Sequence, residues 1–172
     1  MRIIIRSEGP DDYPVIDLVN NQAFNRPNEA WLIRKLRQTG EFVSDLSLVA
    51  EQDEMVVGHI LFYPVYIQSK DDRHQILSLG PMSVLPLYQR KGIGSELIME
   101  GLTRAKSLNY KAVIVLGHAH YYPRFGFKSA SRWGITAPFE APDNAFMALE
   151  LEPHELKGKR GIVIYPEAFK EV

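Results

Sequence analysis

A change of hydrophobic period between residues 75 and 116 constrains the fold more than any other feature of this chain. Residues 75–84 read as a β-strand, residues 92–107 carry apolar side chains at helical spacing, and residues 112–116 are entirely apolar. A strand, a helix and an apolar strand in this order form a βαβ unit, in which the second strand lies parallel to the first. The chain therefore requires a sheet that contains a parallel pair of strands.

The segments on either side of this unit predict further strands and helices. Runs rich in β-formers and bounded by turn residues predict strands at residues 3–6, 46–51 and 55–67, from residue 127, and at 145–151. Residues typical of helix ends predict a first helix that begins within residues 10–14 and ends at about Phe24. They predict a second helix from Asn28, as its N-cap, through Gln38. A short helical turn is expected at residues 120–125. Polar turns make residues 46–84 an antiparallel meander. We therefore expect a mixed α/β sheet, mostly antiparallel with one parallel crossover, flanked by helices.

Size and charge limit the number of domains and the kinds of partner. With 172 residues, 45% of them hydrophobic, the chain can bury one continuous core, so we expect residues 1–172 to form a single domain. The 20 Lys and Arg residues nearly balance the 21 Asp and Glu residues, which gives a formal net charge of −1. This balance creates no long-range field that would gather nucleic acid or an anionic membrane. We therefore expect neither partner.

The chain has no cysteine, which excludes disulfides, thiolate metal sites and a cysteine nucleophile. Its five histidines include one close pair, His118 and His120, without acidic partners at ligand-like spacing, so we expect no metal site. The apolar run at residues 3–5 is too short for a signal peptide, and no segment approaches the roughly 20 apolar residues of a membrane-spanning helix. We therefore expect a cytoplasmic protein.

The segment Gln-Arg-Lys-Gly-Ile-Gly-Ser at residues 89–95 leads from the end of a predicted strand into a predicted helix. Gly92 and Gly94 allow a tight turn and close approach of a ligand, and the amides of a helix N-terminus suit phosphate oxygens. The alternative is an ordinary turn with solvated basic residues. The common nucleotide motifs do not fit, because no G-x-x-x-x-G-K-[ST] is present and Leu97 stands where G-x-G-x-x-G requires glycine. With these two motifs excluded, the segment predicts a pyrophosphate-binding site of another kind.

Residues 89–94 match the Q-x-x-G-x-G motif of the GNAT acetyltransferases. The strand Leu-Gly-Pro-Met-Ser-Val at 79–84 precedes the motif at the family's spacing, and a helix, an apolar strand and Tyr-Tyr-Pro-Arg-Phe-Gly-Phe at 121–127 follow it. The order resembles that family over roughly residues 3–151, and most closely its YhbS-type branch of predicted N-acetyltransferases. The resemblance implies the GNAT fold and transfer of an acetyl group from acetyl-CoA to a primary amine of a small molecule or peptide.

The same resemblance implies a donor site and one catalytic residue. Backbone N–H groups at residues 82–84 would polarise the thioester carbonyl, and Tyr122, four residues before Gly126, would protonate the leaving thiolate. The implied cofactor-binding residues are Met82, Ser83, Val84, Gln89, Arg90, Lys91, Gly92, Ile93, Gly94, Ser95, Tyr122 and Phe125. The alternative for Tyr122 is packing of its ring in the core. The adjacent Tyr121 is expected to pack.

Two parts of the site stay open. Many family members carry an Asn upstream of the Tyr, where this chain reads Leu-Gly-His-Ala-His at 116–120, so His118 or His120 either contacts the pantetheine or the substrate, or is simply exposed. The candidates for the general base are His59, Glu29 and Ser83, and no motif selects among them.

The acceptor has no motif of its own. The two N-terminal helices and residues 133–145 are expected to frame it, and Glu29, Glu140 and Asp143 either attract a cationic amine or are merely solvated. The apolar tail at 161–169 is expected to dock on the domain or on a second subunit, which would give a homodimer. The alternative functions are an acyl-CoA-binding module without turnover and a binder of nucleotides or phosphosugars.

Overall fold

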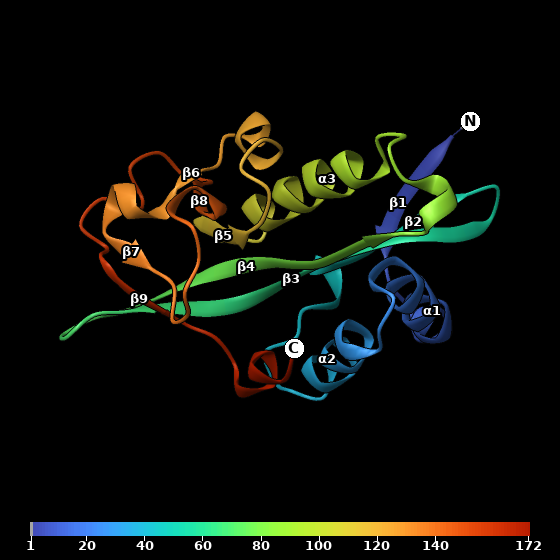
Figure 1. Ribbon diagram of the computed structural model, residues 1–172, viewed down its shortest axis with the longest axis horizontal. Coiled ribbons are helices and arrows are strands. Elements are labelled where there is room, and N and C mark those ends of the chain that lie inside the picture. Colours follow the sequence, from blue (N-terminus) through green and yellow to red (C-terminus); the bar gives the residue numbers. More distant parts are fainter. Residues whose placement is uncertain (1) are drawn as a thin grey trace. The chain divides into compact units, whose positions relative to one another are not determined.

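The computed structural model describes residues 2–172 (Figure 1). The chain forms two compact units, which are interleaved along the sequence. The first unit contains Met1–Tyr63, Gly80–Arg104 and Glu167–Val172, and the second contains Pro64–Leu79 and Ala105–Pro166.

The first unit contains two complete strands, parts of two others, and the helices α1, α2 and most of α3. Its elements are β1 (Ile3–Ser7), α1 (Tyr13–Phe24), α2 (Asn28–Arg37), β2 (Ser47–Gln52), the first part of β3 (Met55–Gln68), the last part of β4 (Arg73–Val84) and most of α3 (Ile93–Ser107). β1 pairs with β2 from Ile3 opposite Gln52, and β2 pairs with β3 from Ser47 opposite Leu61.

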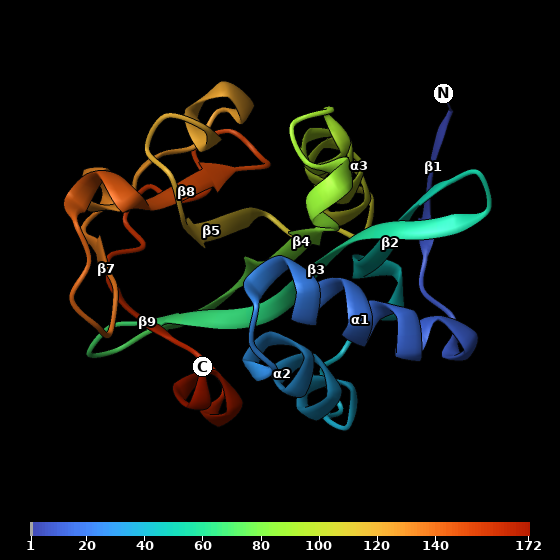
Figure 2. The ribbon, with the colours of Figure 1, turned by 45° about the vertical axis from the view of Figure 1, so that its right-hand side comes forward.

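Helices cover both faces of β3 in the first unit: α1 and α2 lie on one face and α3 on the other (Figures 1 and 2). Successive side chains of a strand point to opposite faces. Leu61 and Tyr63 accordingly join the buried cluster of α1 and α2. Phe62 faces α3, where a Cβ atom at Gly101 would lie 2.1 Å from its ring. The glycine in α3 thus allows the helix to pack closely on the strand.

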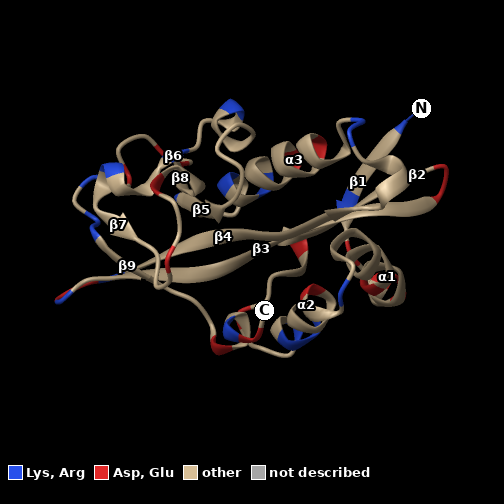
Figure 3. Ribbon diagram, in the orientation of Figure 1, with Lys and Arg blue, Asp and Glu red and all other residues tan. Residues whose placement is uncertain are grey.

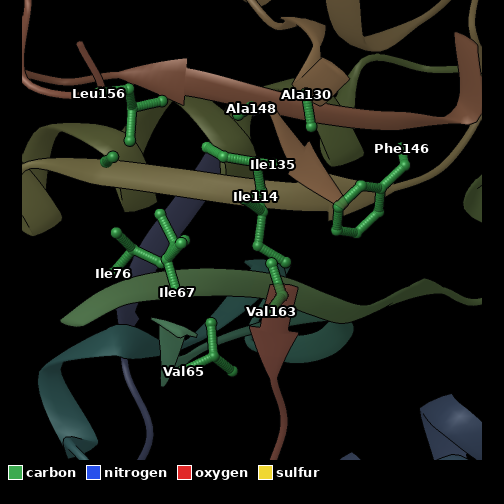
Figure 4. Close-up of a cluster of buried hydrophobic side chains, with 11 residues drawn as sticks. Val65, Ile67, Ile76, Ile114, Ala130, Ile135, Phe146, Ala148, Leu156 and Val163 are labelled. Carbon is green, nitrogen blue, oxygen red and sulfur yellow. The ribbon is translucent and has the colours of Figure 1, made fainter. Parts of the chain in front are cut away.

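The second unit contains the parallel pair of strands. Its elements are the remainders of β3 and β4 with β5 (Ala112–Leu116), β6 (Lys128–Ser129), β7 (Ile135–Thr136), β8 (Phe146–Glu150) and β9 (Gly161–Ile164). β5 pairs in parallel with β4 and antiparallel with β8, and β8 also pairs with β6. β9 pairs antiparallel with β3 and in parallel with β7. A buried cluster that includes Val65, Ile114 and Phe146 fills this unit (Figure 4).

The predicted mixed α/β sheet and the parallel crossover are confirmed. The strand order is β1-β2-β3-β4-β5-β8-β6, with β7 and β9 beside this path. The expected strand at 112–116 has those bounds, and the other long elements differ by one or two residues at their ends. The predicted capping role of Asn28 is wrong, because Pro27 holds the N-cap position and Asn28 is already the first helical residue.

The tail docks on the chain itself, which was one of its two predicted alternatives. Residues 161–164 form β9 on the edge of β3, and Ala168 and Phe169 pack against the cluster of α1 and α2 in the first unit. The parallel β7–β9 pair was not predicted, because two- and four-residue strands leave almost no hydrophobic period to recognise. 

Basic and acidic residues are both scattered over the ribbon (Figure 3), in keeping with the formal net charge of −1. Within residues 2–172, no helix has the length and apolar character needed to cross a membrane.

Candidate active site

The glycine turn of the first unit lies between the end of β4 and the start of α3. After Val84, one 3-10 turn at Pro86–Tyr88 leads into residues 89–92, and α3 begins at Ile93. Arg90 and Gly92 have φ angles of 64° and 87°, in the left-handed region, which glycine adopts without strain and arginine rarely adopts. The side-chain amide of Gln89 donates a hydrogen bond of 2.9 Å to the Val84 carbonyl oxygen. This bond folds the turn back onto the end of β4.

The turn presents backbone N–H groups and positive charge in the same place. The Glu96 N–H donates to the Gly92 carbonyl oxygen at 3.1 Å and closes the first turn of α3. The first amides of an α-helix have no intrahelical acceptor, and the helix dipole adds a partial positive charge there. The ribbon of this turn is blue in Figure 3, and its basic residues are Arg90 and Lys91. Such a turn can bind a phosphate-containing ligand.

The last residues of β4 differ in exposure. Met82 and Val84 are partly exposed, whereas Ser83 is 3% exposed. The Ser83 hydroxyl has no hydrogen-bond partner within residues 2–172. The next residue, Leu85, donates its N–H to the Val57 carbonyl oxygen at 2.8 Å and so holds the start of the turn against β3.

Tyr122 lies in the second unit, at the start of a 3-10 turn over Tyr122–Phe125 that ends at Gly126 with a φ of 100°. The Tyr122 side chain is buried, and its ring makes edge contacts with Phe127 and Tyr121. Burial, with a smaller contribution from Tyr121, raises the pKa of Tyr122 to about 12. The phenol therefore keeps its proton at neutral pH, which is the state that a proton donor requires. Ring packing and a role as an acid are compatible here.

Gly117, which the sequence did not single out, lies directly against the ring of Tyr122. A Cβ atom at Gly117 would lie 2.3 Å from Cε2 and 2.8 Å from Cδ2 of Tyr122. The φ angle of Gly117 is outside the left-handed region, so a side chain is excluded by the tyrosine ring rather than by the backbone. The Gly117 N–H is bonded to the Ala145 carbonyl oxygen at 2.9 Å. Gly117 is therefore a positioning residue for Tyr122.

The neighbours of Tyr122 have distinct environments. Tyr121 contacts Phe125 edge to face at 5.3 Å between ring centroids, and the Arg124 guanidinium lies 4.8 Å from its ring centroid. Tyr121 thus packs, as predicted. His118 and His120 are both exposed. 

The three candidate bases all lie in the first unit. His59 is fully buried and its Nε2 lies 2.8 Å from the Ser47 hydroxyl, so it belongs to an internal network. Burial lowers the pKa of His59 and keeps the ring neutral. Glu29 is paired with Arg26, and Ser83 has its hydroxyl enclosed. None of the three has the geometry of an accessible base.

The predicted site residues fall into two groups. Met82–Val84 and residues 89–95 come together in the first unit, and Tyr122 and Phe125 in the second. Over the described residues 2–172, no three His, Asp or Glu side chains gather as a metal site would require.

The sequence and the fold were compared with those of known proteins. The sequence model of the acetyltransferase (GNAT) family matches residues 13–127 of this chain. The uncharacterized N-acetyltransferase YhbS of Escherichia coli (strain K12) is 35% identical over 168 residues, which cover 97% of this chain and 98% of that protein. This chain therefore belongs to the GNAT acetyltransferase family, and the predicted resemblance is confirmed.

Two solved structures of GNAT family proteins are similar to this chain over nearly its whole length. The crystal structure of the GNAT family N-acetyltransferase YhbS from Escherichia coli in complex with CoA has a TM-score of 0.91 at 33% identity and covers 99% of this chain and 93% of that one. A GNAT family acetyltransferase from Brucella melitensis in complex with acetyl-CoA has a TM-score of 0.78 at 35% identity, with 98% of each chain covered. The mixed sheet of this chain is thus the GNAT fold.

Proposed function

We propose that this chain transfers the acetyl group of acetyl-CoA to a primary amine of a small molecule or peptide. The observation that carries the proposal is the glycine turn between β4 and α3, where basic residues and helix N-terminal amides lie together. Two similar proteins, which carry CoA and acetyl-CoA in their crystal structures, support this choice of donor. The residues proposed to bind the donor are Met82, Ser83, Val84, Gln89, Arg90, Lys91, Gly92, Ile93, Gly94, Ser95, Tyr122 and Phe125.

The chemistry proceeds by direct transfer. The acceptor loses a proton to water, and its neutral nitrogen attacks the thioester carbonyl carbon. A C–N bond forms and the C–S bond breaks, with its electron pair going to sulfur. The sulfur accepts the proton of the Tyr122 phenol, the nitrogen releases its second proton to solvent, and the phenolate is reprotonated from solvent. One proton is released overall, and the products are an amide and the free thiol of CoA.

The two compact units are proposed to act as one catalytic domain. The family match over residues 13–127 includes segments of both units, and β3 and β4 each contribute to both. The identity to YhbS over 97% of the chain supports the same view. 

An acceptor screen tests the proposed reaction. We expect at least one primary amine to raise the release of free thiol from acetyl-CoA at least about tenfold over the rate without amine. Because the chain has no cysteine, a thiol reagent reports CoA alone. If the protein binds acetyl-CoA but no amine raises thiol release, the proposal is wrong and the chain is an acyl-CoA-binding module.

A further inference from the structure

A hollow of about 640 Å³ lies in the second unit, and all its lining residues fall between residues 131 and 146. This volume is within the range of small-molecule sites in proteins, about 300–1,000 Å³. The 3-10 turn Asp143–Ala145 and the start of β8 form part of its wall. No residue assigned above to the donor or to Tyr122 lines it.

The apolar part of this hollow has an aromatic surface. Ile135 and Phe146 are nearly fully buried, so they form a fixed floor. Phe139 is 43% exposed although it contacts Phe146 and Tyr165, with ring centroids 6.1 Å and 5.9 Å away. An aromatic ring that is held by two others and still open to solvent can stack against an apolar ligand.

The polar part of the hollow is acidic. Glu140 and Asp143 line it and are both exposed, and over residues 2–172 neither carboxylate forms an ion pair. The remaining lining residues carry no charged side chain. Two unpaired carboxylates beside an aromatic surface complement a ligand with a cationic head and an apolar body.

Backbone bonds join this hollow to the surroundings of Tyr122. Phe146 lies opposite Leu116 in the β5–β8 pair, and Ala145 accepts the N–H of Gly117 at 2.9 Å. Gly117 in turn lies against the Tyr122 ring. The wall of the hollow and the proposed acid are thus both attached to the paired strands β5 and β8 of the second unit.

From these observations we infer that the hollow binds the acceptor, and that the acceptor class is a primary amine on an apolar, preferably aromatic, body. The ammonium group lies near Glu140 and Asp143, and the apolar body lies against Phe139. The inference rests on the proposed function for the role of acceptor, but the binding site itself does not depend on turnover.

Calorimetric titration of 2-phenylethylamine into the full chain, without acetyl-CoA, tests the site. We expect saturable binding, and about tenfold weaker binding in the Glu140→Gln, Asp143→Asn double variant, because two weak ion pairs are lost. The neutral analogue 2-phenylethanol should bind the wild type about as weakly as the amine binds the double variant. Asp71→Asn, at an exposed position of the same unit outside the hollow, should bind like the wild type.

A second pair of variants tests the aromatic surface. Phe139→Ala should weaken binding of 2-phenylethylamine about fivefold and leave the affinity for ethanolamine unchanged. Leu108→Ala removes a side chain of equal exposure, 43%, outside the hollow and should have no effect. Absence of 2-phenylethylamine binding, or equal affinity in all variants, would overturn the inference. Failure of acetyl-CoA to bind would instead contradict the proposed function and leave this binding result standing.

Discussion

Replacing Tyr122 with Phe is expected to lower kcat about 100-fold or more, because the variant keeps the buried ring and loses only the hydroxyl that is proposed to protonate the leaving thiolate. The edge contacts with Tyr121 and Phe127 and the burial of the ring need no hydroxyl. The affinity for acetyl-CoA should therefore stay within about threefold of the wild type. Steady-state kinetics with the best amine of the acceptor screen, together with a titration of acetyl-CoA, measure both quantities.

Tyr121→Phe is the matched control, since it removes a hydroxyl from the adjacent residue and should leave kcat within about threefold. Gly117→Ala provides an independent variant, because its methyl group would meet the Tyr122 ring at 2.3 Å and displace it. It should lower kcat in the wild-type background and have little further effect in Tyr122→Phe. Unchanged kcat in Tyr122→Phe would remove Tyr122 as the acid.

Replacing Arg37 with Ala is expected to cost about 3–5 kcal/mol of unfolding free energy, because the change leaves a buried carboxylate without its partner. The Arg37 guanidinium donates hydrogen bonds to both carboxylate oxygens of Glu8, at 2.9 and 3.0 Å. The two side chains are only 8% and 1% exposed. Denaturant unfolding measures the loss. Arg34→Ala on the same helix is the control, because its pair with Asp17 is half exposed and should contribute at most about 1 kcal/mol.

The same network predicts how stability depends on pH. Burial alone would raise the pKa of Glu8, but the interactions with His59, Arg37 and Ser47 outweigh it and lower the pKa to about 2. A lowered pKa in the folded state stabilises the protein above the unfolded value of about 4.5, and this stability is lost as the pH falls from 4.5 toward 2. Glu8→Gln should therefore make the unfolding free energy depend less steeply on pH between 4.5 and 2. An equally steep decrease in both proteins would contradict this account of the network.

Those parts of the fold with a strong hydrophobic period were predictable from the sequence. Residues 112–115 are buried as a parallel strand inside a sheet needs, and only the last residue of the strand, Leu116, is exposed. The apolar residues of α3 that recur at helical spacing, such as Ile93 and Leu97, are buried as well. Local cap chemistry was less reliable: Asn28 looks like a cap, yet Pro27 takes that position and Asn28 enters the helix. The short strands β7 and β9 depend on pairing with distant segments, which no local pattern encodes.

The candidate site also has features that the sequence could predict and features that it could not. Its glycines and basic residues are a contiguous motif, so the position of the turn could be predicted. The bond from Gln89 to the Val84 carbonyl and the contact between Gly117 and Tyr122 depend on how the chain folds back on itself. In the sequence, the two histidines after Gly117 were the candidates for a role in this segment. In the structure it is Gly117 itself that lies against the Tyr122 ring.

Calorimetric titration of acetyl-CoA into the wild type and into a Gly92→Glu, Gly94→Glu variant tests the central claim most directly. The added carboxylates would repel the pyrophosphate at the α3 N-terminus, so binding should weaken at least about 100-fold. Gly94→Glu alone separates charge from backbone strain, because Gly92 has a positive φ and Gly94 does not. Gly40→Glu adds the same charge at an exposed, open position and should bind normally. Tight binding that is lost only in the turn variants is the predicted result, whereas no binding to the wild type, or equal binding to all four proteins, would contradict the proposed donor site.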